Sequence, residues 1–189
     1  GQSVSYSLTL LEGWNIRQVR AAVAAHDVLE QTLGDRDDDT LMTILGRPGV
    51  HPEGRFFPDT YQFTRGTTDV EFLRRAMEKM DQELAAAWEA RAEDLPIKDA
   101  EEALILASII EKETGQVEER PEIAGVFSRR LRKGMKLQTD PTVIYGMGER
   151  FDGNIRRKDL REDTPYNTYV HHGLPPTPIA MPGRGSLRA

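Results

Sequence analysis

The chain has 189 residues, of which 38% are hydrophobic and 30% charged, and its 25 basic and 31 acidic side chains leave a net charge of −6. This length suits one good-sized domain, and the acidic balance argues against nucleic acid as a partner, because no basic field is available to meet phosphates. The absence of cysteine excludes disulfides and thiolate-bound metals, and no apolar run approaches the roughly 20 residues of a membrane-spanning helix.

The first 66 residues alternate between patterns typical of strands and of helices. Asn15 and Gln18 have the spacing of a capping box, which marks the start of a helix. The aromatic-rich segment from Pro52 to Gly66 is bounded by turn residues and is predicted to be extended. In chain order we predict a strand over 4–10, a helix from 16 to about 26, a short helix over 40–45 and a strand after Asp59.

The rest of the chain, 67–189, is predicted to be mainly helical. Thr68 and Glu71 form a second capping box, and Asp99 with Glu102 caps the helix that follows. The expected helices are 69–92, one running to about Thr114, one from Pro121 to Gly134, and a short one with Asp140 as N-cap and Pro141 as first residue, ending at Gly146. Residues 148–163 show no period, and four prolines after Leu174 predict an extended loop. We therefore predict a single α+β domain over 1–189.

Two glutamates end the most apolar run of the chain, Leu104 to Ile110. On a helix, Glu111 and Glu113 lie about 160° apart and cannot share a face. Glu111 projects toward Leu104 and Ala107, nearer the rim of the helix. Four other apolar side chains lie within about 60° of Glu113, those of Leu106, Ile109, Ile110 and Val117. Burial of Glu113 would raise its pKa, as a general acid working near neutral pH requires. The alternative is that Glu113 pairs with an arginine or is exposed, since ion pairs also perturb pKa values.

Other catalytic chemistries find little support in the sequence. The four histidines lack the spacing of metal ligands, and no nucleophile elbow or phosphate-binding glycine loop is present, so we predict neither a metal nor a cofactor. Polar and aromatic residues downstream of Glu113 instead suit a cleft that binds sugars, since amides and phenols bind hydroxyls. These residues are Gln138, Thr139, Asp140, Tyr145, Tyr166, Asn167 and Tyr169.

Several runs of the chain together resemble the endolytic murein transglycosylases of the YceG/MltG family. The resemblance covers the chain from about Leu10 onward. Its motifs are Ala107 to Thr114 with Glu-Lys-Glu-Thr, Val126-Phe127 with Arg130-Leu131, Gly134 to Gly146 with Gln-Thr-Asp-Pro-Thr-Val, Tyr166 to Tyr169, Gly173 to Pro176, and Glu53-Gly54 with Pro58 to Tyr61.

The resemblance implies an enzyme at the periplasmic face of the bacterial inner membrane that cuts nascent peptidoglycan glycan strands internally and leaves 1,6-anhydro-muramic ends. Its catalytic glutamate corresponds to Glu113, the residue that the helical geometry also selects. Ser108 joins the sugar-binding candidates on the same ground. Peptidoglycan synthases of the elongation and division machinery are the expected protein partners.

The chain also departs from the family pattern. The family's membrane helix and LysM-like region are absent, and the family continues beyond Ala189 with a strand-rich stretch, so a catalytic-domain fragment of a membrane-anchored protein is expected. Arg129, Thr177 and Met181 replace the Asn, Gly and Asn that are common in the family.

Two other functions stay open. A muramidase-type hydrolase would use Glu113 with Asp140 or Glu111 as its second carboxylate, although Asp140 is also a good N-cap. A glycan-binding or divisome scaffold module would bind strands without cleaving them.

Overall fold

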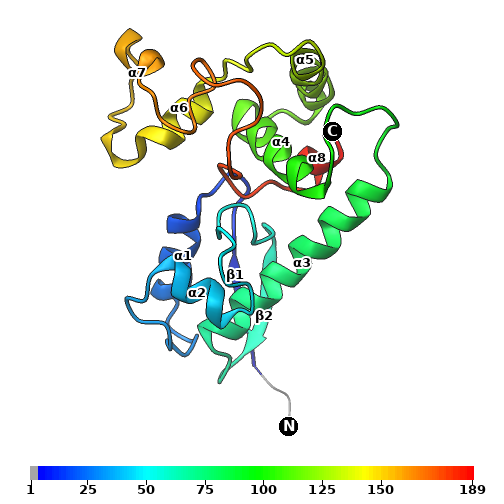
Figure 1. The fold of residues 1–189 in the computed structure, drawn as a ribbon. Coiled ribbons are helices and arrows are strands. Elements are labelled where there is room, and N and C mark those ends of the chain that lie inside the picture. Colours follow the sequence, from blue (N-terminus) through cyan, green and yellow to red (C-terminus); the bar gives the residue numbers. More distant parts are fainter. Residues whose placement is uncertain (1–3) are drawn as a thin grey trace.

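The computed structural model describes residues 4–189 and consists of two lobes connected by one long helix (Figure 1). The lower lobe holds β1 (Ser5–Thr9), α1 (Ile16–Ala25), α2 (Asp38–Ile44) and β2 (Thr60–Thr64), and α3 (Asp69–Glu89) leads upward from it. The upper lobe holds α4 (Ala100–Glu113), η1 (Val117–Glu119), α5 (Arg120–Arg132), α6 (Asp140–Met147), η2 (Gly148–Arg150), α7 (Arg157–Arg161) and α8 (Arg184–Arg188). The predicted α+β class is confirmed.

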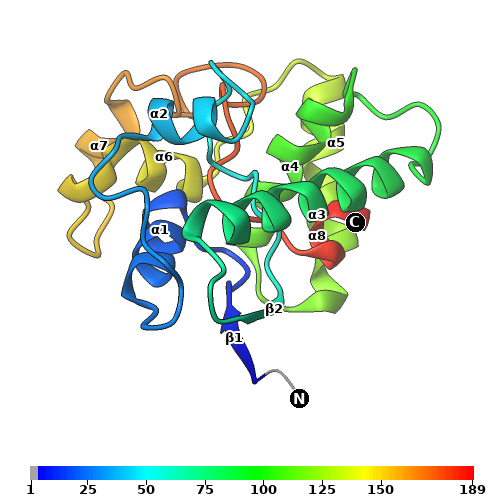
Figure 2. The same cartoon turned by 90° about the horizontal axis from the view of Figure 1, so that it is seen from below.

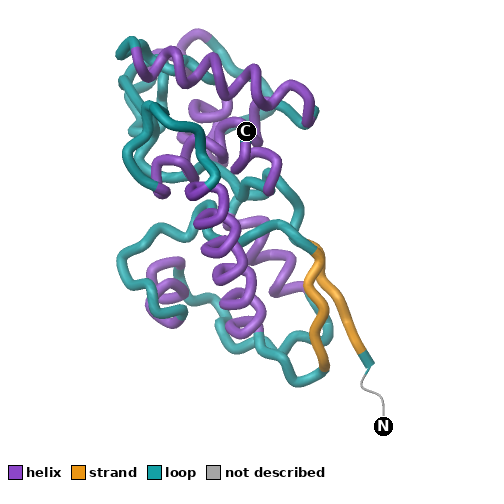
Figure 3. The backbone as a smooth tube through the Cα atoms, turned by 90° about the vertical axis from the view of Figure 1, so that its right-hand side faces the viewer, coloured by secondary structure: helices purple, strands orange, loops and turns teal. Residues whose placement is uncertain are grey.

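The two strands form an antiparallel ribbon at one end of the molecule, as Figure 3 shows. Tyr6 pairs with Phe63 and Leu8 with Tyr61, so the apolar positions of both strands share one face. The rings of Tyr61 and Phe63 meet Phe72 of α3 edge to face, with centroids 5.4 and 5.8 Å apart. Both predicted strands are therefore confirmed, and the aromatic-rich segment belongs to the core.

Helix α3 is long enough to pack on both lobes, and Figure 2 shows it running across the molecule. Its first half buries Phe72 and Met77 in the core of the lower lobe. Its second half buries Met80 and Leu84 against Leu104 of α4. The predicted capping box is present, because the Glu71 N–H donates to Thr68 and the Thr68 N–H donates to Glu71. This helix therefore fixes the two lobes relative to each other.

The proline-rich loop returns from the upper lobe to the lower one. Its backbone exchanges two hydrogen bonds with residues before α1, from Met181 N–H to the Trp14 carbonyl (2.8 Å) and from Gly13 N–H to the Met181 carbonyl (2.9 Å). Ile179 N–H donates to the hydroxyl of Ser108 on α4 (3.0 Å). The extended loop thus lies between α4 and the lower lobe and holds both.

Several short elements differ from the prediction. Helix α7 and the turn η2 lie within the stretch that shows no period, and α7 starts where Arg156 N–H donates to Asp159 (2.8 Å). Helix α8 was also not predicted. The N-cap of α6 is Thr139, and Asp140 is the first helical residue, so the cap prediction is wrong by one position. Five-residue helices are too short to show a period, which explains the two missed helices.

No helix in the described part of the chain, residues 4–189, has both the length and the apolar character needed to cross a membrane.

Candidate active site

Glu113 is the last residue of α4, and its side chain is exposed rather than buried. The predicted orientation of the two glutamates is therefore wrong. Glu111 is the buried one, with 9% of its surface exposed. Its carboxylate accepts hydrogen bonds from Gly183 N–H (2.8 Å) and the Ser186 hydroxyl (3.1 Å), and it lies 3.4 Å from the guanidinium of Arg120.

The error has a physical cause. Every residue of α4 from Leu104 to Glu111 is buried, because α3, α5, α6 and α8 surround the helix. A helix covered on all sides has no exposed face for apolar periodicity to reveal. Glu111 can stay inside because partners from the far end of the chain satisfy its carboxylate, and Glu113 is exposed because the helix ends there.

The Glu113 carboxylate is held by the segment that precedes α6. The hydroxyl of Thr139 donates to it at 2.7 Å. Thr139 is itself buried, and its N–H donates to the hydroxyl of Thr168 at 3.0 Å. Gln138, directly before it, is exposed and has a φ of 51°, in the left-handed region that side chains other than glycine rarely adopt. A fixed hydroxyl therefore orients the carboxylate, while the rest of the side chain is open to solvent.

Asp140 and Tyr169 lie beside this pair. The Tyr169 hydroxyl donates to the Asp140 carboxylate at 2.6 Å. Burial first, then this hydrogen bond and the negative charges of Asp140 and Glu113, raise the pKa of Tyr169 to about 12. Tyr169 therefore keeps its proton at neutral pH. Glu113, Thr139, Asp140 and Tyr169 form one cluster, which we call the Glu113 cluster.

A large cavity of about 970 Å³ opens next to this cluster, between α1 of the lower lobe and α6 of the upper lobe. Glu113 lies outside it, in a neighbouring hollow of about 440 Å³. Three residues line both spaces, so the two are adjacent: Gly13, Gln18 and Lys112. The cavity is large enough for a sugar unit or more. The Glu113 carboxylate lies in the hollow beside it.

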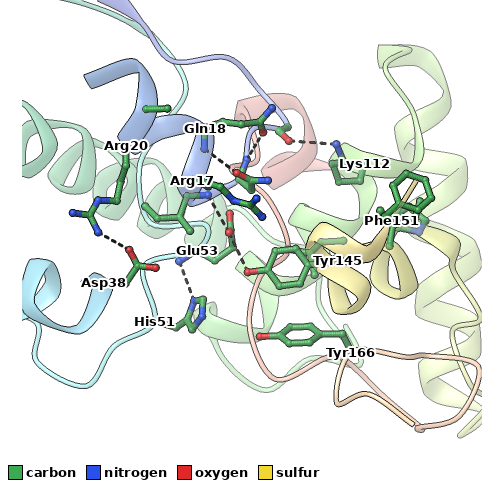
Figure 4. A pocket seen from close by; sticks show the side chains of 18 of the residues that line it. Arg17, Gln18, Arg20, Asp38, His51, Glu53, Lys112, Tyr145, Phe151 and Tyr166 are labelled. Carbon is green, nitrogen blue, oxygen red and sulfur yellow. Dashed lines mark hydrogen bonds and ion pairs between the residues drawn. The ribbon is translucent and has the colours of Figure 1, made fainter. Parts of the chain in front are cut away.

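The wall of the cavity carries Tyr145, Tyr166 and a carboxyl group that no prediction assigned to the site, Glu53 (Figure 4). The rings of Tyr145 and Tyr166 meet edge to face with centroids 4.8 Å apart. The Tyr145 hydroxyl donates to Glu53 at 3.1 Å, and the two side chains point toward each other in Figure 4. Burial raises the pKa of Glu53 to about 7, against hydrogen bonds from Ile16 and Tyr145 that lower it.

Sequence reasoning placed Glu53 in a motif but gave it no role. One signal could have found it: a glutamate stands just before the buried aromatics Phe56 and Phe57, where an acidic residue is out of place. Glu53 is completely buried, with 0% exposure. Gly54 beside it has a φ of 81°, and a Cβ there would come within 2.5 Å of Pro178, so the loop packs tightly on the proline-rich segment.

Two of the predicted sugar-binding residues have internal partners instead. Ser108 is fully buried, donates to the Ile105 carbonyl (2.6 Å) and accepts from Ile179. Asn167 is 1% exposed, and its amide donates to the carbonyls of Asp159, Leu160 and Glu162. Neither offers a polar atom to the cavity, so the structure does not bring them into the site with the others.

The arrangement combines an exposed carboxylic acid, an oriented hydroxyl and an aromatic-lined cavity. Such a site can bind a sugar chain and transfer a proton to or from it. No group of three or more His, Asp or Glu side chains within 4–189 is placed to hold a metal ion.

Comparisons with known proteins identify the family of the chain. The model of the YceG-like family matches residues 1–189. The endolytic murein transglycosylase of Bacillus subtilis strain 168 is 34% identical over 201 residues, covering 98% of this chain and 55% of the relative. The endolytic murein transglycosylase of Streptococcus pneumoniae R6 is 29% identical, covering 90% of this chain and 30% of the relative.

The crystal structure of a YceG-like protein from Listeria monocytogenes superposes with a TM-score of 0.77 at 32% identity, over 97% of this chain and 66% of that one. The chain thus spans about half the length of the B. subtilis relative. Because the family model matches its whole length, the chain belongs to the YceG-like family.

Proposed function

We propose that this chain cleaves murein glycan strands internally by lytic transglycosylation, with Glu113 as the acid and base. One observation carries the assignment: Glu113 is an exposed carboxylic acid held by a buried hydroxyl, that of Thr139, beside a cavity lined by aromatic rings. The B. subtilis and S. pneumoniae relatives carry the name of this activity, which supports the proposal.

The reaction needs one carboxyl group that works twice. Glu113 first protonates the oxygen between N-acetylmuramic acid and N-acetylglucosamine, and the bond from C1 to that oxygen breaks. The Glu113 carboxylate then takes the proton of the muramic 6-hydroxyl, whose oxygen bonds to C1. The product carries a 1,6-anhydro ring and no water is consumed. Because the nucleophile belongs to the same sugar, its proximity replaces a second catalytic carboxylate.

The Glu113 cluster and the cavity beside it support both steps of the proposal. The hydrogen bond from the Thr139 hydroxyl fixes the direction of the Glu113 carboxylate, which both proton transfers need. Tyr145 and Tyr166 offer ring faces and edges on which sugars can pack. Tyr169 belongs to the same cluster as the acid, and the exposed Gln138 directly precedes Thr139, so both are candidates for binding hydroxyl and acetamido groups.

A hydrolase remains the second candidate because of Asp140. This carboxylate is exposed and belongs to the same cluster as Glu113, and a muramidase would use such a pair, one as acid and one as base or nucleophile. The hydrogen bond from Tyr169 occupies one of its oxygens, which favours a positioning role instead.

We extend the proposal to the setting of the enzyme. Peptidoglycan glycan strands are the substrate, the periplasmic face of the inner membrane is the location, and peptidoglycan synthases are the partners. The full-length protein is anchored to that membrane in this proposal.

Digestion of purified glycan strands tests the proposal. We expect the strands to shorten to intermediate lengths, rather than to release disaccharides from one end, and each cut to create an anhydro end detected by mass spectrometry. Strands that keep their length after incubation with wild-type protein, while still binding it, would instead support a glycan-binding module.

A further inference from the structure

The carboxyl group of Glu53 is buried, and no Lys, Arg or His side chain in the described range 4–189 forms a salt bridge with it. Within residues 4–189, the Ile16 N–H and the Tyr145 hydroxyl donate to it, and its charged neighbour, the carboxylate of Asp38, raises its pKa further. A buried carboxyl group that lacks a basic partner lowers the free energy of unfolding, so Glu53 destabilises the folded protein.

One oxygen of this group connects three parts of the chain. Oε2 accepts from Ile16 N–H (3.0 Å), the first residue of α1, and from the Tyr145 hydroxyl (3.1 Å) on α6. Glu53 itself belongs to the segment that leads into β2. The bond to Ile16 satisfies one of the free N–H groups at the start of α1, next to the Asn15 cap. The two helices that face each other across the large cavity are therefore held by the same atom.

From Tyr145 the contacts continue into the upper lobe. Its ring packs on Tyr166, and the Tyr166 hydroxyl bonds to Thr177 of the proline-rich loop (2.8 Å). The second oxygen of Glu53, Oε1, is buried and has no partner within residues 4–189. Only one of the two carboxyl oxygens therefore accepts hydrogen bonds. A buried carboxyl group that served stability alone would be expected to have both oxygens hydrogen-bonded.

We propose that Glu53 is a positioning residue for glycan binding: by holding Tyr145 against the start of α1, it sets the width of the cavity and the orientation of the Tyr145 and Tyr166 rings. This inference rests on the proposed function, because it assumes that the cavity receives the glycan strand. Glu53 does not touch the reacting atoms, since Glu113 lies in the neighbouring hollow.

The molecule contains a matched control. Arg17 of α1 and Glu149 of η2 form a second bridge across the same cavity (2.9 Å), but their side chains are 63% and 84% exposed. Exposed ion pairs contribute little, so Glu149→Gln should leave binding unchanged. Glu53→Gln keeps an oxygen that can accept from both Ile16 and Tyr145, and it should behave nearly like wild type. Glu53→Leu and Tyr145→Phe remove the connection.

Binding of peptide-free glycan strands is measured by calorimetry in a Glu113→Gln background, which prevents turnover, and KM and kcat are measured in the active background. We expect Glu53→Leu and Tyr145→Phe to weaken binding about tenfold. KM should rise accordingly while kcat changes by less than about threefold, and Glu53→Gln and Glu149→Gln should match the parent. Tyr145→Phe carries the test if Glu53→Leu does not fold, because it removes a single hydroxyl.

Parent-like binding by folded Tyr145→Phe would overturn the inference and leave the proposed function standing. A tenfold loss of affinity in Glu149→Gln as well would also overturn it, because breaking any contact between the two sides of the cavity would then weaken binding equally. If the Glu113→Gln parent binds no strands, the proposed function fails and this inference fails with it.

Discussion

The hydroxyl of Thr139 donates a 2.7 Å hydrogen bond to the carboxylate of Glu113 and so joins the end of α4 to the start of α6. Thr139 is buried and Glu113 is exposed, so the fixed partner directs the one that faces solvent. The direction of the proposed catalytic acid is thus set by packing in the upper lobe.

Replacing Thr139 by valine should slow the reaction without unfolding the protein. Valine has the shape of threonine but no hydroxyl, and the loss of a hydrogen bond to a charged group should lower kcat roughly 10- to 100-fold. Thr139→Ser keeps the hydroxyl and should recover most of the rate. Steady-state kinetics on glycan strands check this, and equal rates for the valine and serine variants would mean that the hydrogen bond does not matter.

Glu113→Gln should abolish cleavage and preserve strand binding. The amide keeps the shape of the side chain but cannot donate a catalytic proton, so the rate should fall at least about 100-fold. Glu118→Gln is the matched control, since Glu118 is an exposed glutamate of η1 outside the proposed site. Cleavage is followed by chromatography of the digested strands. A Glu113→Gln variant with appreciable activity would remove Glu113 from the mechanism.

Glu111→Gln should chiefly lower stability. The substitution leaves the buried guanidinium of Arg120 without its closest carboxylate, and breaking such a pair costs about 3 kcal/mol. Urea unfolding measures the loss, with Glu118→Gln again as the control. A Glu111 variant as stable as wild type yet unable to cleave strands would mean that Glu111, rather than Glu113, is the acid.

Features of the fold that depend on residues close together in the sequence could be predicted, and features that depend on distant residues could not. The cap of α1 lies within four residues, Asn15 to Gln18, and was predicted correctly, as were the alternating strands. The predicted orientation of Glu111 and Glu113 was wrong because the burial of Glu111 depends on Gly183 and Ser186, which are 72 and 75 residues away. These residues cover the side of α4 that the apolar periodicity predicts to be exposed.

The candidate site shows the same limit. Motifs led to Glu113, Thr139 and Tyr145, all of which lie at the hollow or the cavity or contact residues there. Glu53 was missed as a functional residue because its partner Tyr145 is 92 residues away. Ser108 and Asn167 look like sugar ligands in the sequence, but their hydrogen bonds are used inside the fold.

The stability of the wild-type protein should fall between acidic and mildly alkaline pH because of Glu53. Burial raises its pKa from 4.5 to about 7, so the folded state binds this proton more tightly than the unfolded state. The contribution is complete below pH 4.5 and is lost as pH rises through 7, on the order of 3 kcal/mol in all.

Glu53→Gln carries no titrating group and should lose less stability over the same range. Urea unfolding of both proteins at pH 5, 6, 7 and 8 gives the difference directly, and subtraction removes the effect of other groups that titrate there, His51 included. Parallel pH profiles for the two proteins would show that Glu53 is ionised throughout this range and that water reaches its carboxylate in solution.

The central claim, that a sugar hydroxyl rather than water attacks C1, is tested most directly by cleaving glycan strands in water enriched in heavy oxygen. The proposed mechanism predicts new ends that carry no label, resist borohydride reduction and weigh one water less than reducing ends. Asp140→Asn should still produce them. New ends that contain heavy oxygen and are reduced by borohydride would contradict the account and identify a hydrolase, with Asp140 as the first residue to test as its second carboxylate.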